Sequence, residues 1–245
     1  MTNNPFEDRD LEYDPFENEL TTSEPASESA LSQDEFERLL EGARSLEPLY
    51  DLQAEFVILL SGRLGMRRGE ITHLEKDWVD QENERIHVPQ HEPCKMGKDG
   101  GLCGLCRNAA KQMADINDVP FEEVAGLYWK AKTSEAERDI PYGWSDQCKN
   151  IINEFFDEFD GYYASASSIT RRVEDSLEAA EGLDSDDTTP HGLRATAASY
   201  HASRGLNVWG LQGFMGWAYP QTAQHYVVYE GERIEKSLDD IHNVN

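Results

Sequence analysis

Positive charge is scarce in this chain of 245 residues. Lysine and arginine together number 22, against 48 aspartates and glutamates, and the formal net charge is −26. Taken alone, this excess of acid argues against a nucleic-acid partner, because proteins bind phosphates with Lys and Arg side chains that displace counterions.

The acid is spread along the whole chain and lysines are scarcer than arginines, a pattern typical of halophile proteins that work at high salt. At molar salt the Debye length falls to about 3 Å, so a local basic cleft could still bind an anion in close contact. Net charge therefore does not decide the partner.

Long apolar runs are also absent. None approaches the length needed to cross a bilayer, and the start, MTNNPFEDRDLEYDPFENEL, lacks the basic-then-apolar order of a signal peptide. These absences predict a cytoplasmic protein with no membrane partner. Cysteine is rare as well, with four residues in all, too few for a disulfide scaffold.

The chain divides into an acidic start and a globular remainder. Residues 1–30 are rich in Asp and Glu and end in the linker-like TTSEPASESA, which predicts a disordered acidic tail. Ser32 and Glu35 then form a Ser-x-x-Glu capping box, so a helix begins there. We expect the folded domain to span 31–245.

Apolar periodicity predicts helices through most of that domain. Helical segments are expected at 54–63, 67–79, 147–159 and 167–182, and from Thr189 onward with breaks at Gly205 and Gly216. Short strands are expected at 85–89 (RIHVP), 129–132 (WKAK) and 137–141 (ERDIP). The predicted fold class is mainly α with a small antiparallel β-sheet (α+β).

A candidate site begins with TTPHGLRATAASYHASRG, which holds His191 and Arg194 in an H-x-x-R spacing. On a helical turn this spacing points an imidazole and a guanidinium the same way. Upstream, GRLGMRRGEITHL places Arg67 at a glycine break before a helix, and KAKTSEAERDIP puts Lys132 at a strand end. Downstream, LQGFMGWAYPQTAQHYV places a tyrosine nine residues after a tryptophan.

In this order the motifs resemble the tyrosine recombinase (lambda-integrase, or phage integrase) family. Its signature is a G-[LM]-R-x-x-E block, a hairpin lysine before a Thr and an R-x-x-P strand, then H-G-L-R. An L-G-[HW] motif follows, with the nucleophilic tyrosine nine residues later. The match runs from about residue 31 to 235, so the resemblance implies a tyrosine-recombinase catalytic domain.

The resemblance further implies a site-specific DNA recombinase or integrase of a mobile element, which cleaves and rejoins strands through a covalent 3′-phosphotyrosine. By this resemblance Arg67 and Arg194 would clamp the phosphate, and Lys132 and His191 would handle protons. Trp217 would support the site, and Tyr226 would attack. Planar guanidiniums suit a phosphate whose negative charge grows in the transition state. Neither ATP nor a catalytic metal is required.

Several alternatives stay open. Arg68 is the rival of Arg67 as clamp, and Tyr219 and Tyr229 are rival nucleophiles. Arg171 and Arg172 lie where the family docks a helix into the major groove, so they are candidate DNA-binding residues. The alternative interpretation is that they belong to an ordinary solvent-exposed helix face.

The implied partner is double-stranded DNA at a specific recombination site, bound by a dimer or tetramer. Family members usually carry an N-terminal core-binding domain, whose place is taken here by the acidic tail. A separate clamp or accessory protein is therefore a candidate partner. The alternative functions are a recombinase-derived DNA-binding or regulatory protein that has lost cleavage, and DNA relaxation like that of a type IB topoisomerase.

An insertion at about 90–127 contains HEPCKMGKDGGLCGLC. Two pairs with two-residue gaps are typical of a zinc site, and the glycines permit tight turns. The candidate ligands of this structural zinc are His91, Cys94, Cys103 and Cys106, with Cys148 competing for the fourth position.

Overall fold

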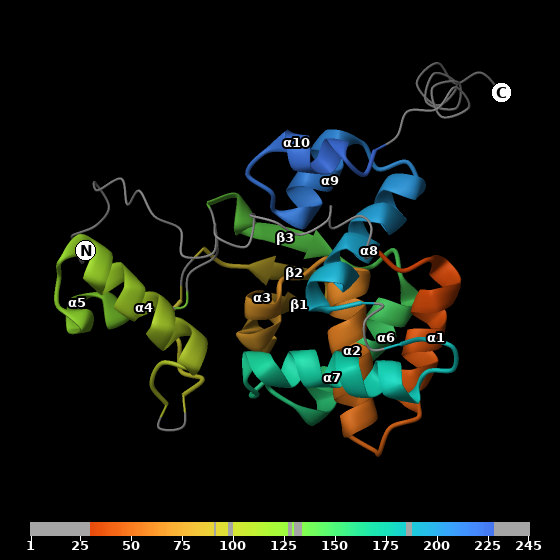
Figure 1. The fold of residues 1–245 in the computed structure, drawn as a ribbon, viewed down its shortest axis with the longest axis horizontal. Helices are drawn as coiled ribbons and strands as arrows, with labels where there is room; N and C mark the ends of the chain where they lie inside the picture. The colour runs from red at the N-terminus through yellow and green to blue at the C-terminus, as the bar shows by residue number, and fades with distance from the viewer. Residues whose placement is uncertain are drawn as a thin grey trace.

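The computed structural model describes residues 30–90, 92–97, 100–126, 129, 134–184 and 188–227. All but the last residue of the predicted acidic tail lies outside this part of the chain. The helices and strands, shown in Figure 1, are α1 (Gln33–Arg44), α2 (Tyr50–Gly62), α3 (Arg68–Thr72), η3 (Lys76–Trp78), β1 (Val79–Asp80), β2 (Arg85–Val88), α4 (Gly104–Asn117), α5 (Phe121–Ala125), η4 (Ser134–Ala136), β3 (Arg138–Pro141), α6 (Asp146–Glu158), α7 (Ala166–Ala179), α8 (Pro190–Ser203), α9 (Val208–Met215) and α10 (Pro220–Gln224). The expected mainly helical fold with a small antiparallel sheet is confirmed.

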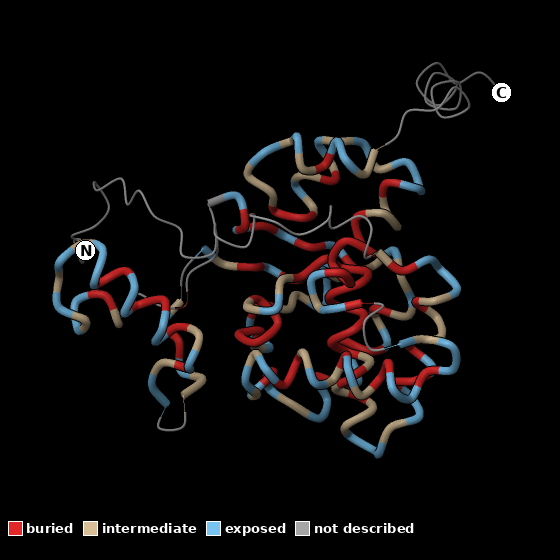
Figure 2. Tube along the Cα trace, viewed as in Figure 1, coloured by how far each residue is buried: buried red, intermediate tan, exposed pale blue. Residues whose placement is uncertain are grey.

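Helix α2 lies at the centre of the core. From Phe56 to Leu60 its sequence is apolar on every side, as expected for a helix surrounded by others, and Phe56, Leu59 and Leu60 are fully buried. Helices α1, α6, α7 and α8 all pack against it. Phe56 stacks on Phe155 of α6 with ring centroids 3.7 Å apart. Figure 2 shows buried residues concentrated in the middle of this bundle.

Polar caps mark where several of the helices begin. The Ser32 hydroxyl accepts from the backbone N–H of Glu35 at 3.3 Å, and the Glu35 carboxylate accepts from the backbone N–H of Ser32 at 2.7 Å. The predicted capping box of α1 is therefore confirmed. Ser145 caps α6 and Thr189 caps α8 through their hydroxyls, so the helix with the H-x-x-R motif has a defined start.

The sheet is three-stranded and antiparallel in the order β1-β2-β3. Ile86 pairs with Ile140 across the β2–β3 register, and both are buried while their neighbours along each strand face solvent. This alternation confirms the strands predicted at 85–89 and 137–141. The predicted strand 129–132 falls, except for its first residue, outside the described residues.

The segment 67–79 is not the long helix that its apolar spacing predicts. Helix α3 ends at Thr72 because the following backbone pairs with a distant segment: the Leu74 carbonyl accepts from the Tyr162 N–H at 3.0 Å. The apolar residues that recur at helical spacing in this segment, Ile71, Leu74 and Trp78, are still buried. A helical turn followed by a 3-10 turn thus buries the same positions as a continuous helix.

The cysteine-rich insertion contains two helices that its sequence did not indicate, α4 and α5. They pack on each other and lie to one side of the bundle in Figure 1. The first turn of α4 approaches α3, since a β-carbon at Gly69 would lie 3.6 Å from the Leu105 side chain. The insertion therefore stands against the turn that begins at Arg67.

Candidate active site and metal centre

Three arginines converge on the last turn of α9. Backbone carbonyls of three successive residues there each accept from a different guanidinium. The pairs are Arg138 to Phe214 at 2.9 Å, Arg194 to Met215, and Arg67 to Gly216 at 2.6 Å. The last carbonyls of a helix have no partner within it and carry partial negative charge, so cationic donors suit them. Side chains from β3, α8 and the start of α3 therefore fix the residues directly before Trp217.

Arg67 is the N-cap residue of α3. Its backbone N–H and its Nη1 each donate to the Glu70 carboxylate at 2.8 Å, and its side chain is 20% exposed. The neighbouring Arg68 is an exposed residue of the first turn of α3. Of the two arginines considered from the sequence, Arg67 is the one that joins the group at α9.

A buried ion pair accompanies Arg67. Arg138 donates from Nη1 and Nη2 to the two carboxylate oxygens of Glu70, at 3.0 and 2.9 Å. Burial alone would raise the pKa of Glu70, but the charges of Arg138 and Arg67 outweigh it and hold the pKa well below its ordinary range. Both residues stand in the motifs quoted above, yet the sequence assigned no role to either.

Arg194 on α8 is the most enclosed of the three arginines, at 6% exposed. Its guanidinium donates to the carbonyls of Gly65 and Met215. Burial, together with the neighbouring charge of Arg67, lowers its pKa well below the ordinary value. The guanidinium carbon lies 5.8 Å from the centroid of the Trp217 ring.

Trp217 and Tyr226 stack, with ring centroids 5.5 Å apart and planes 15° from parallel. Burial raises the pKa of the Tyr226 hydroxyl, and the charge of Arg194 works against that rise. Tyr219, by contrast, is 69% exposed, and Tyr229 lies outside the described residues. Among the described tyrosines considered as nucleophiles, Tyr226 is the one beside an arginine of the group.

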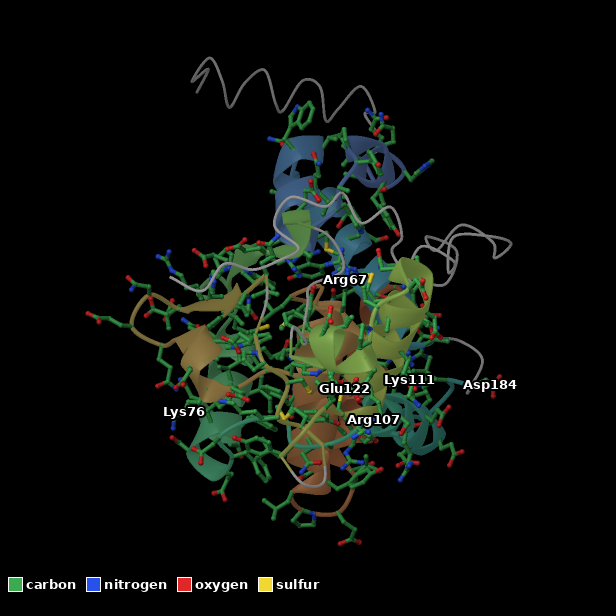
Figure 3. All side chains as sticks on the ribbon, turned by 90° about the vertical axis from the view of Figure 1, so that its left-hand side faces the viewer. Arg67, Lys76, Arg107, Lys111, Glu122 and Asp184 are labelled. Carbon is green, nitrogen blue, oxygen red and sulfur yellow. The ribbon has the colours of Figure 1, made fainter. Side chains whose placement is uncertain are left out.

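The two predicted proton-handling residues differ in what can be described. His191 is exposed on the first turn of α8, three residues before Arg194. Lys132 lies outside the described residues. In Figure 3, Arg67 is labelled below the blue helices of the C-terminal part of the chain.

The two candidate DNA-binding residues of α7 have different surroundings. Arg171 is exposed. Arg172 lies over the ring of Tyr50 with its guanidinium carbon 3.6 Å from the centroid, and it donates to Gln53 at 2.6 Å. Its guanidinium is thus engaged with α2 within the protein.

The cysteines of the insertion gather around a histidine that the sequence did not single out, His73. Its Nε2 lies 3.4, 3.5 and 3.2 Å from the Sγ atoms of Cys94, Cys103 and Cys106. The four ligand atoms all lie within 4.8 Å of one another. Three thiols and one imidazole form a donor set that could hold a metal ion.

Of the two other candidates for the fourth position, His91 lies outside the described residues. Cys148 is buried at the start of α6, where burial raises the pKa of its thiol to about 11, and it is no member of the ligand group. No local spacing in the sequence links His73 to the cysteines, because the first of them, Cys94, lies 21 positions further along the chain.

The fold is that of tyrosine-recombinase catalytic domains. The solved structure of XerA recombinase matches with a TM-score of 0.54 and 19% identity, over 88% of this chain and 64% of that one. A Tn1549 transposon integrase in complex with circular intermediate DNA matches with a TM-score of 0.60 and 19% identity, over 89% and 68%. XerH site-specific recombinase bound to difH substrate matches with a TM-score of 0.53 and 16% identity, over 86% and 53%.

The chain belongs to the phage integrase family, whose model matches residues 29–232. It spans from about half to about two thirds of the lengths of the solved recombinase chains named above. No curated protein matches its sequence. None of the helices in the described residues has the length and apolar character that a bilayer crossing needs.

Proposed function

We propose that this protein is a site-specific DNA recombinase or integrase that cleaves and rejoins strands through a phosphotyrosine formed on Tyr226. The observation that supports this most is the convergence of Arg67 and Arg194 on the carbonyls directly before Trp217, which itself stacks on Tyr226. Two guanidiniums, an indole N–H and a phenol are the donors and the nucleophile that phosphoryl transfer requires.

In the proposed reaction the phenolic oxygen of Tyr226 attacks the scissile phosphorus, and the bond from phosphorus to the 5′-oxygen breaks. Arg67 and Arg194 neutralise the charge that grows on the non-bridging oxygens. Strand exchange follows when the 5′-hydroxyl of another strand attacks the phosphotyrosine and releases Tyr226. The energy of the bond is conserved throughout, so the proposed reaction needs no cofactor.

Proton transfer must accompany this attack. Because burial raises the pKa of Tyr226, the hydroxyl is protonated near neutral pH and must lose its proton as the bond to phosphorus forms. We assign His191 to accept that proton and Lys132 to protonate the leaving 5′-oxygen. Reversal of the two transfers serves the rejoining step.

The test uses nicked suicide DNA taken from the attachment region of the mobile element, at high salt. The wild-type protein is expected to form a covalent protein–DNA adduct, Tyr226→Phe to form none, and Tyr219→Phe and Tyr229→Phe to form it normally. DNA binding without any adduct would favour the recombinase-derived DNA-binding protein. An adduct accompanied by supercoil relaxation but no recombinant product would favour the topoisomerase-like activity.

The proposed partner is double-stranded DNA at a specific site, bound in the cytoplasm by a dimer or tetramer with a separate clamp or accessory protein. The excess of acid suits work at halophilic salt concentrations, where distributed charge is screened. We also propose that the three insertion cysteines, with a histidine as the fourth ligand, hold a structural zinc.

A further inference from the structure

The distances in the His73 group match those of a tetrahedral zinc site. With Zn–S near 2.3 Å and Zn–N near 2.0–2.1 Å, a tetrahedral site separates sulfur and nitrogen ligands by about 3.6 Å. The three distances from His73 Nε2 to sulfur are 3.2, 3.4 and 3.5 Å. The three nitrogen–sulfur distances therefore lie within about 0.4 Å of that spacing, and all four ligand atoms lie within 4.8 Å of one another.

The imidazole is also oriented for binding an ion. His73 Nδ1 lies 2.7 Å from the Gly69 carbonyl, which can only accept, so Nδ1 carries the proton and Nε2 offers its lone pair. The ring packs on Trp129 with centroids 5.5 Å apart, and His73 is 4% exposed. An outer hydrogen bond and a packed aromatic ring thus hold the ligand in one orientation.

Two of the sulfurs accept backbone hydrogen bonds. The N–H of Cys103 donates to the Cys94 sulfur at 3.3 Å, and the N–H of Cys106 donates to the Cys103 sulfur at 3.4 Å. Donors of this kind stabilise thiolates, the form that binds metal. Both donors belong to the turn that starts α4, so metal binding and the start of that helix are linked.

Helix α3 connects this cluster to the arginines. It is only five residues long, with Arg67 as its N-cap and His73 as its C-cap. So short a helix is unstable alone and depends on contacts at its ends. The Arg67–Glu70 hydrogen bonds hold one end, and the contact from His73 to the Gly69 carbonyl holds the other.

We propose that His73 is the fourth ligand of a zinc ion bound with Cys94, Cys103 and Cys106, and that this ion positions Arg67 by clamping the far end of α3. His73 is a positioning residue, since it acts on the phosphate site through Arg67. The part that concerns DNA cleavage rests on the proposed function.

Metal analysis of the full-length protein tests the ligand assignment. We expect one zinc per chain in the wild type, in His87→Ala, whose exposed imidazole on β2 makes it the matched control, and in His91→Ala. His73→Ala and Cys103→Ser are expected to lose it, and His73→Cys to restore a four-sulfur site. Cobalt substitution should give tetrahedral absorption bands that shift in His73→Cys. Zinc retained in His73→Ala but lost in His91→Ala would overturn the assignment.

Amide hydrogen exchange tests the coupling without DNA. Removing zinc by chelation, or by His73→Ala, is expected to speed exchange at least roughly tenfold in Ile71 and Leu74, whose N–H groups donate to the backbone carbonyls of Arg67 and Ile71. Exchange in the core helix α2 serves as the internal reference, since acceleration there as well would report general unfolding. If α2 also exchanges faster, the comparison is repeated with His73→Cys, measured once with zinc bound and once after the zinc is removed by chelation. Unchanged exchange in α3 after zinc loss would overturn the coupling.

Adduct formation on suicide DNA gives the functional readout. The rate is expected to fall roughly tenfold or more in His73→Ala and to recover in His73→Cys, because a misplacement of about 1 Å can cost about 100-fold in rate. DNA affinity is expected to change much less. Zinc loss with an unchanged rate would refute the positioning role. Should the wild-type protein form no adduct, the recombinase proposal fails, and hydrogen exchange still decides whether the ion clamps α3.

Discussion

Arg138 and Glu70 form a two-point ion pair between positions 68 residues apart in the chain. The two residues are buried, at only 9% and 2% exposed. The same carboxylate accepts twice from Arg67, so one buried anion holds two guanidiniums in place. Removing one member of such a group leaves uncompensated buried charge.

Replacing Glu70 with Gln is expected to lower the free energy of unfolding by about 3–5 kcal/mol, the usual cost of breaking a buried ion pair from one side. Urea denaturation measures the change. Glu82→Gln, which alters an exposed glutamate, is the matched control and should change the free energy by less than about 0.5 kcal/mol. A loss below about 1 kcal/mol in Glu70→Gln would contradict the importance of the pair.

The same pair sets an acid limit on stability. The pKa of Glu70 is held well below its ordinary value of 4.5, so the unfolded chain takes up a proton at this residue before the folded chain does. The stabilisation is complete above about pH 4.5 and is lost progressively as the pH falls. In unfolding curves at several pH values, the gap between wild type and Glu70→Gln should narrow below that pH. Parallel curves would show that Glu70 titrates normally.

Trp217 is expected to act through its indole N–H. Trp217→Phe keeps an aromatic ring against Tyr226 but removes the donor, and the rate of adduct formation should fall by roughly 100-fold or more, as when one transition-state donor is lost. Trp217→His keeps a donor and should lose far less. Trp209→Phe, at an exposed position of α9, is the control. Equal rates in Trp217→Phe and Trp217→His would indicate a packing role only.

Arg171 and Arg172 form a natural pair for comparison on α7. Arg172→Ala removes a guanidinium from the face of Tyr50 and should lower the free energy of unfolding by about 1 kcal/mol. Arg171→Ala should leave stability unchanged, weaken DNA binding, and reduce the slope of log affinity against log salt by about 0.9. Unaltered affinity and slope in Arg171→Ala would remove α7 from the proposed DNA surface.

The net charge of −26 predicts that salt stabilises the fold. Raising KCl from about 0.1 M to about 1 M shortens the Debye length from about 10 Å to about 3 Å, which screens repulsion among the acidic side chains. The midpoint of thermal unfolding should rise over this range. Chloride is the proper salt, because sulfate strengthens apolar burial in any protein. A flat or falling midpoint would count against adaptation to high salt.

Motif order in the sequence was enough to anticipate which residues lie together. Arg67, Arg194, Trp217 and Tyr226 are far apart in the chain, yet the family signature grouped them, and their side chains do meet around the end of α9. The cap of α1 was equally predictable, because it depends on two residues three positions apart.

Long-range partners were not predictable in the same way. The pairing of Glu70 with Arg138 depends on how α3 and β3 pack, which no local pattern encodes. The run of glycines and cysteines in the insertion predicted turns, so helix α4 was not expected. His73 was not considered as a ligand because it lies outside the insertion. The helix predicted over 67–79 stops early because backbone pairing with Tyr162 overrides side-chain periodicity.

In the proposed reaction, the carbonyls at the end of α9 would compete with the phosphate for the two arginines. Arg67 and Arg194 already donate to Gly216 and Met215, so a phosphate that took these N–H groups would replace existing acceptors, and the net gain from such a swap is small. The two arginines should therefore change the rate of cleavage far more than the dissociation constant for DNA. The displaced carbonyls would also release the segment that leads to Tyr226 at the moment its substrate arrives.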